Sequence, residues 1–142
     1  LGVPHYLIQS TLTGVVAQRL VRTLCPHCKQ VASQDPQAWN VLTHGWNMPV
    51  PAQVCAPVGC LECRNTGFMG RTGIYEMMKL SSRLRSMISA QLDLSGFGQA
   101  ALAEGMRPLR ISAADQVAAG LTTVQEVLTV LPPIDDFDND QP

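Results

Sequence analysis

The chain has 142 residues, which is enough for one compact domain or two small subdomains. Ten basic residues against eleven acidic ones give a formal net charge of −1, so the chain lacks the basic excess that drives binding to nucleic acid. No apolar run reaches the roughly 20 residues needed to span a bilayer, and no segment resembles a signal peptide.

An amphipathic pattern near the N-terminus predicts a helix that starts after Pro4 and ends at Leu24. Gln18 and Arg22 fall on its polar side, whereas Arg19 falls within the apolar stripe. A buried guanidinium needs an anionic or carbonyl partner. Arg19 therefore either reaches solvent at the edge of the stripe or pairs with an acidic group or a nucleotide in another domain. The apolar positions of the stripe are Ile8, Leu12, Val15, Val16 and Leu20.

Residues 25–70 differ in character from the rest of the chain. They contain all five cysteines, both tryptophans and half of the ten prolines. A short helix is expected at residues 36–42, and turns are expected over most of the remainder. A stretch with so few aliphatic residues buries little core of its own, so a bound metal ion could supply the missing stability.

Two C-x-x-C pairs lie in this region, Cys25 with Cys28 and Cys60 with Cys63. Four thiolates on two such turns can close a tetrahedron around Zn²⁺, which predicts a structural zinc site with no open position for water. A thioredoxin-like redox pair, two disulfides and four free thiols are the alternatives. The odd cysteine, Cys55, is interpreted as a free thiol, with exchange into the metal site as its alternative.

The sequence after residue 70 predicts one strand and then four helices. The strand covers residues 74–79, and the acidic residues 132–142 are expected to be disordered. Cap residues and glycines mark the helix ends. The first helix is expected to start at Ser81 or Ser82, the second to run from Ser95 to Gly105, and the third from Pro108 to Gly120. The last helix is expected to start at Thr122 or Thr123, and its buried face is Val124, Val127, Leu128 and Leu131.

No phosphate-binding loop of the form G-x-x-x-x-G-K-[ST] occurs in the chain. The only lysines are Lys29 and Lys79, and neither follows a glycine. No G-x-G-x-x-G pattern and no nucleophile elbow occur either. The chain alone is therefore predicted to catalyse no reaction.

Several ordered motifs resemble the family of type II secretion and type IV pilus assembly ATPases. GVPHYLI at residues 2–8, LTGVVAQRLVR at 12–22 and LCPHCK at 24–29 resemble the run that follows that family's histidine box. GCLECRNTGFMGRTGIYE at residues 59–76 is similar to its second cysteine motif. EGMRPLR at 104–110 and GLTTVQEVL at 120–128 resemble its closing segments, whereas the region between Lys29 and Gly59 matches no motif of the family.

The resemblance implies a hexameric motor in the cytoplasm, peripheral to the bacterial inner membrane, that uses ATP and Mg²⁺ to drive assembly of a pilus or pseudopilus. Its partners would be the inner-membrane platform proteins of the secretion or pilus system. The family's phosphate loop and acidic and histidine boxes would precede Leu1. The matching zinc ligands are Cys25, Cys28, Cys60 and Cys63.

The expected fold is α+β and mostly helical, with a small irregular tetra-cysteine subdomain at the C-terminal edge of a RecA-like ATPase fold. We expect residues 1–24 to form the last helix of the ATPase domain, 25–70 the zinc-binding subdomain, 71–131 a helical subdomain and 132–142 an acidic tail. The start at Leu1 favours a piece of a longer protein over a small protein with a processed end. A stand-alone zinc-ribbon adaptor that binds other proteins is the alternative function, and a redox module is a third.

Overall fold

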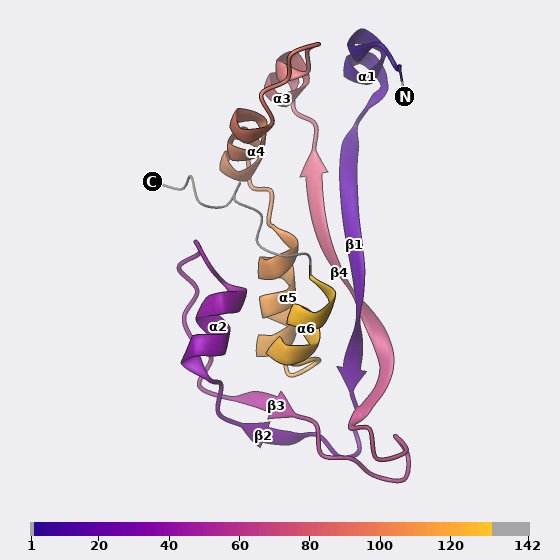
Figure 1. Cartoon of the computed structure of the whole chain (residues 1–142), viewed down its shortest axis with the longest axis vertical. Coiled ribbons are helices and arrows are strands. Elements are labelled where there is room, and N and C mark those ends of the chain that lie inside the picture. Colours follow the sequence, from indigo (N-terminus) through magenta and orange to yellow (C-terminus); the bar gives the residue numbers. More distant parts are fainter. Residues whose placement is uncertain (1, 132–142) are drawn as a thin grey trace. The chain divides into compact units, whose positions relative to one another are not determined.

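The computed structural model describes residues 2–131 and mixes helices with strands (Figure 1). The described residues form six helices and four strands. In chain order these are α1 (His5–Thr11), β1 (Gly14–Leu24), β2 (Gln30–Ala32), α2 (Pro36–Leu42), β3 (Val54–Ala56), β4 (Phe68–Lys79), α3 (Ser82–Met87), α4 (Leu94–Ala103), α5 (Leu109–Ala118) and α6 (Val124–Val130). The mixture of helix and strand is as predicted, but strand occupies more of the chain than expected.

The long N-terminal helix is the main error of the sequence interpretation. The helix ends at Thr11, and residues 14–24 form strand β1, which pairs with β4 in a two-stranded sheet. Val15, Val16, Val21 and Thr23 are β-branched and favour a strand. Their apolar spacing also fits a helical stripe, so periodicity alone could not distinguish the two. Backbone pairing with β4, which lies more than 40 residues later in the sequence, makes this segment a strand.

The described chain divides into two compact units, each made of two separate stretches. Residues 2–17 and 76–108 form one unit, and residues 18–75 and 109–131 form the other. Strands β1 and β4 contribute to both units. The four-part division expected from the sequence stays a prediction, as does the edge of a RecA-like fold.

The unit of residues 2–17 and 76–108 is built around helices α3 and α4. Its buried core consists of Leu80, Leu84, Ile88, Ala100 and Ala101. Ile8 and Leu12 from the N-terminal stretch pack against this core. The Leu80 N–H donates to the Thr13 carbonyl at 2.9 Å, which joins the two stretches of this unit.

The unit of residues 18–75 and 109–131 contains the cysteines. Here β2 pairs antiparallel with β3, with Val31 opposite Cys55. Trp39 on α2 is buried, and its Nε1 donates to the Met48 carbonyl at 3.2 Å. Residues of strands β1 and β4 and of helices α5 and α6 complete the core of this unit. Its largest fully buried apolar side chains are Val21, Leu24, Trp39, Leu42, Ile74, Ile111, Val117, Val124 and Val127.

The helix boundaries follow the local signals in most cases. Asp35 caps α2 by accepting the Gln37 N–H, and Ser81 caps α3 by accepting the Leu84 N–H. Helix α4 begins at Leu94 rather than after Ser95, because Asp93 takes the N-cap position. The predicted strand at residues 74–79 is correct but too short, since β4 already begins at Phe68.

The expected disorder of residues 132–142 concerns a segment outside the described residues. Among residues 2–131, no helix has the length and apolar character needed to cross a membrane.

Candidate metal centre

The four cysteines of the two C-x-x-C pairs lie together, with all their Sγ atoms within 4.8 Å of one another. The Sγ–Sγ distance is 3.9 Å between Cys25 and Cys60, 3.8 Å between Cys28 and Cys63, and 3.8 Å between Cys60 and Cys63. A tetrahedron with Zn–S bonds of about 2.3 Å has an edge of about 3.8 Å. The sulfur positions therefore fit one tetrahedral metal ion and are too far apart for disulfide bonds.

The first cysteine turn begins where β1 ends. Cys25 is buried, and its carbonyl accepts the N–H groups of Cys28 at 3.3 Å and Lys29 at 3.0 Å. This tight turn brings Cys28 back toward Cys25 before β2 starts at Gln30. The Cys25 N–H donates to the Gly67 carbonyl at 2.9 Å, so the first turn is attached to the segment that follows the second turn.

The second cysteine turn lies between β3 and β4. Asn65 donates its N–H to the Cys60 carbonyl at 2.8 Å, and the Thr66 hydroxyl donates to the Cys63 carbonyl at 2.6 Å. Arg64 and Asn65 both have positive φ angles, 55° and 59°, which lets the chain reverse sharply directly after Cys63. The reversal directs the chain into β4.

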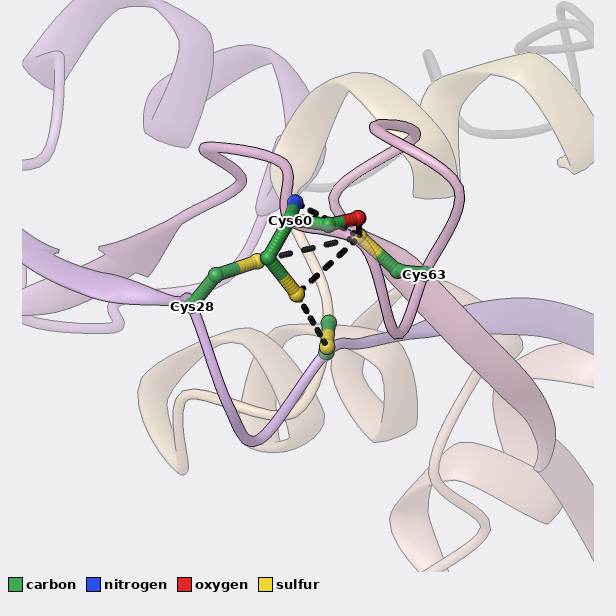
Figure 2. Close-up of side chains that lie close together, drawn as sticks. Cys28, Cys60 and Cys63 are labelled. Carbon is green, nitrogen blue, oxygen red and sulfur yellow. Dashed lines mark hydrogen bonds between the residues drawn. The ribbon is translucent and has the colours of Figure 1, made fainter.

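Backbone N–H groups point at two of the sulfurs. The Gly59 N–H donates to Cys28 Sγ at 3.3 Å, and the N–H groups of Cys60 and Gly67 both donate to Cys63 Sγ at 3.2 Å. Figure 2 shows the side chains of Cys28, Cys60 and Cys63 converging. Donors of this kind favour the thiolate, which is the form that binds a metal ion. Sequence reasoning missed Gly59 and Gly67, although glycines next to both ends of the second turn were a visible signal.

The thiols of Cys28 and Cys63 have pKa values shifted in opposite directions. Burial raises the pKa of the Cys28 thiol to about 11. Burial also acts to raise the pKa of Cys63, but the N–H groups of Cys60 and Gly67 outweigh it and lower this pKa to about 6. The lowered pKa of Cys63 favours its thiolate, which is the form that binds a metal ion.

Cys55 lies on β3, opposite Val31, and is not part of the group of four. Its Sγ is 2.8 Å from the position that a Cβ on Gly120 would occupy. It is therefore packed against the turn between α5 and α6. The structure does not bring Cys55 into the cluster, and its exchange into a metal site stays a prediction.

Arg19 does not occupy the position expected from the helical wheel. It lies on strand β1, is exposed, and its Nη1 donates to the Gln18 carbonyl at 2.8 Å. Residues 14–24 form a strand, so Arg19 does not lie on a helical apolar stripe. A role for Arg19 toward an acidic group or a nucleotide stays a prediction.

Arg22, which sequence reasoning had placed on the polar face, pairs with a carboxylate. Its Nη2 is 2.6 Å from Glu126 Oε2. Only one half of a capping box forms at the start of α6, where the Thr123 hydroxyl accepts the Glu126 N–H. The Glu126 carboxylate binds Arg22 instead of returning to the Thr123 N–H. The Arg22 guanidinium lowers the pKa of the Glu126 carboxyl, and that carboxylate raises the pKa of Arg22.

Comparison with known proteins confirms the resemblance. The type IV pilus assembly ATPase TfpB of Acinetobacter baylyi is 46% identical over 132 residues, which are 93% of this chain and 23% of TfpB. Type II secretion system protein E of Aeromonas hydrophila is 37% identical over 92% of this chain and 25% of its own length. Type II secretion system ATPase E of Vibrio cholerae is 33% identical over 92% of this chain and 25% of its own length.

The chain thus spans about a quarter of the length of these relatives. Its residues 1–129 match the sequence model of a family described as Type II/IV secretion system protein. The match covers both cysteine pairs and all six helices except the last residue of α6. The chain belongs to the Type II/IV secretion system protein family.

Proposed function

We propose that this chain is the part of a secretion or pilus assembly ATPase that carries a structural zinc lobe and the helices packed beside it. The single observation that carries the proposal is the arrangement of four cysteine sulfurs at the spacing of a tetrahedral site, in a chain of this family. The names of the relatives support the choice of an ATPase as the whole protein.

The chemistry of the donor set supports zinc as the metal. Four thiolates form a soft, closed set of ligands that suits Zn²⁺ and leaves no coordination position for a reacting water. The ion would therefore hold the lobe together without activating water. Cys25 and Cys28 would bind it from the end of β1, and Cys60 and Cys63 from the turn before β4.

ATP hydrolysis belongs, in this proposal, to the whole protein. No phosphate-binding loop occurs in the chain, so ATP and Mg²⁺ would bind to parts that the relatives have and this chain lacks. The whole protein would work as a homo-hexamer at the cytoplasmic face of the inner membrane, in contact with platform proteins. The lobe and helices of this chain would contribute to packing within that assembly.

The test measures bound metal and ATP turnover on the same preparation. The chain, purified under reducing conditions, should contain one zinc ion per molecule by elemental analysis and should show no ATP hydrolysis above the blank. A variant with Cys25→Ser and Cys28→Ser should lose the zinc, whereas the matched control Cys55→Ser should keep it. Zinc-free wild-type protein, or ATP turnover by this chain alone, would contradict the proposal.

A further inference from the structure

The turn between α5 and α6 is attached to both sides of the first cysteine turn. The Leu24 N–H, directly before Cys25, donates to the Leu121 carbonyl at 2.8 Å. Lys29 Nζ, directly after Cys28, donates to the Gly120 carbonyl at 2.8 Å. The segment that carries Cys25 and Cys28 is thus held at both ends by residues that lie more than 90 positions along the chain.

A buried carboxylate continues this attachment into α6. Glu126 is 7% exposed, and its Oε1 accepts the backbone N–H of Arg22 at 3.0 Å. Its Oε2 accepts the guanidinium Nε at 2.9 Å and Nη2 at 2.6 Å. The Thr122 hydroxyl donates to the Arg22 carbonyl at 2.8 Å. Arg22 lies on β1, three positions before Cys25. Its backbone N–H, its carbonyl and its side chain are therefore all bound by residues 122–126.

The same guanidinium also reaches the segment after the second cysteine turn. It lies 4.3 Å from the centre of the Phe68 ring, a favourable position for a cation over an aromatic face. Phe68 directly follows Gly67, whose N–H binds Cys63 Sγ and whose carbonyl binds the Cys25 N–H. Arg22 therefore connects α6 to the backbone that positions both cysteine pairs.

From these contacts we propose that Glu126 and Arg22 are positioning residues of the metal centre, and that metal binding and docking of α6 on β1 are thermodynamically coupled. The inference rests on the proposed metal binding but goes beyond it. Glu126 belongs to neither cysteine motif and lies 63 positions after Cys63.

The coupling has a simple physical basis. A bound metal ion would tie the two turns to each other. The Arg22–Glu126 bonds attach α6 to the strand that leads into the first turn, and the Arg22–Phe68 contact extends this attachment to the segment after the second turn. If docked α6 favours the metal-bound arrangement, bound metal favours docked α6 by the same factor. Coupling between sites is commonly about 5- to 150-fold in affinity. We expect the lower part of this range, because Glu126 contacts the cysteine turns only through Arg22.

The experiment measures zinc affinity by competition with a chromophoric chelator on the 142-residue chain. Glu126→Gln keeps the size of the side chain but removes its charge, and we expect zinc affinity to fall about 5- to 10-fold. The matched control is Gln125→Ala, an exposed neighbour on the same helix, which should leave the affinity unchanged. In parallel, hydrogen exchange of residues 121–130 is measured in the wild-type chain with zinc and with chelator.

We expect chelation to accelerate exchange across residues 121–130. Unchanged exchange there, or Glu126→Gln with the zinc affinity of the wild type, would overturn the coupling while leaving the metal site intact. If Glu126→Gln does not fold, the wild-type exchange comparison decides alone. A chain that binds no zinc at all refutes the metal site itself, so the two failures are distinguishable.

Discussion

Two glycines with nearly the same positive φ angle allow a sharp test of the packing around the metal centre. Gly67 has a φ of 75° and Gly70 a φ of 77°. An L-residue in this left-handed region costs about 1–2 kcal/mol, and this penalty is common to both positions. Their surroundings differ, because a Cβ on Gly70 would meet nothing within 4 Å, whereas a Cβ on Gly67 would lie 2.4 Å from the Cβ of Pro57.

The magnitude follows from that difference. Forcing an extra methyl group into closed packing costs about 1–3 kcal/mol beyond the backbone penalty. We therefore expect Gly70→Ala to lower the free energy of unfolding by about 1–2 kcal/mol and Gly67→Ala by about 2–5 kcal/mol. The displacement at Gly67 would also disturb its bonds to Cys25 and Cys63, so zinc affinity should fall about 10- to 100-fold in that variant and stay unchanged in Gly70→Ala.

The assay is denaturant unfolding of the zinc-loaded chain, followed by zinc competition on the same variants. Both alanine variants carry the backbone penalty, so the difference between their free energies of unfolding reports the packing cost at Gly67. Equal stabilities and equal zinc affinities for Gly67→Ala and Gly70→Ala would refute the close packing of Gly67 against Pro57 and its role beside the cysteine turns.

Three further predictions concern other side chains of the same unit. Cys63→Ser should abolish stoichiometric zinc binding, whereas Cys55→Ser should retain one zinc per chain by elemental analysis. Because Arg22 lowers the pKa of the Glu126 carboxyl, this pair stabilises the fold above the ordinary glutamate pKa of about 4.3, and its contribution is lost as the pH falls through the lowered value. The stability difference between wild type and Glu126→Gln should therefore shrink below about pH 4 in denaturant titrations, and a constant difference would contradict the pair. Thr123→Ala should lower the unfolding free energy by about 1 kcal/mol, since it removes the cap of α6, and an unchanged midpoint would contradict that role.

Short elements with a local signal were predictable from the sequence. Helix α2 has the predicted bounds because Asp35 and Pro36 define its start locally. Thr123 caps α6 and Gly120 ends α5 with a positive φ of 67°, as their residue types indicate. In each case the decisive interaction lies within a few residues of the chain, where spacing and residue type carry the information.

Interactions between distant segments were not predictable in the same way. The spacing of Val15, Val16 and Leu20 fits a helix, but pairing with β4 makes this segment a strand. The same error led the search for a paired charge to Arg19 instead of Arg22. Nothing local to Arg22 indicates that its partner is Glu126, 104 positions away. The cysteine cluster could be predicted because two C-x-x-C pairs are a local pattern typical of a four-thiolate metal site, whatever the path of the intervening chain.

The nature of the sulfur cluster is tested most directly by X-ray absorption at the zinc edge of the purified, reduced chain. We expect one zinc ion per chain with four sulfur neighbours at about 2.3 Å and no nitrogen or oxygen ligand. A folded chain that takes up no zinc, or a zinc ion with fewer than four sulfur ligands, would contradict the four-cysteine centre.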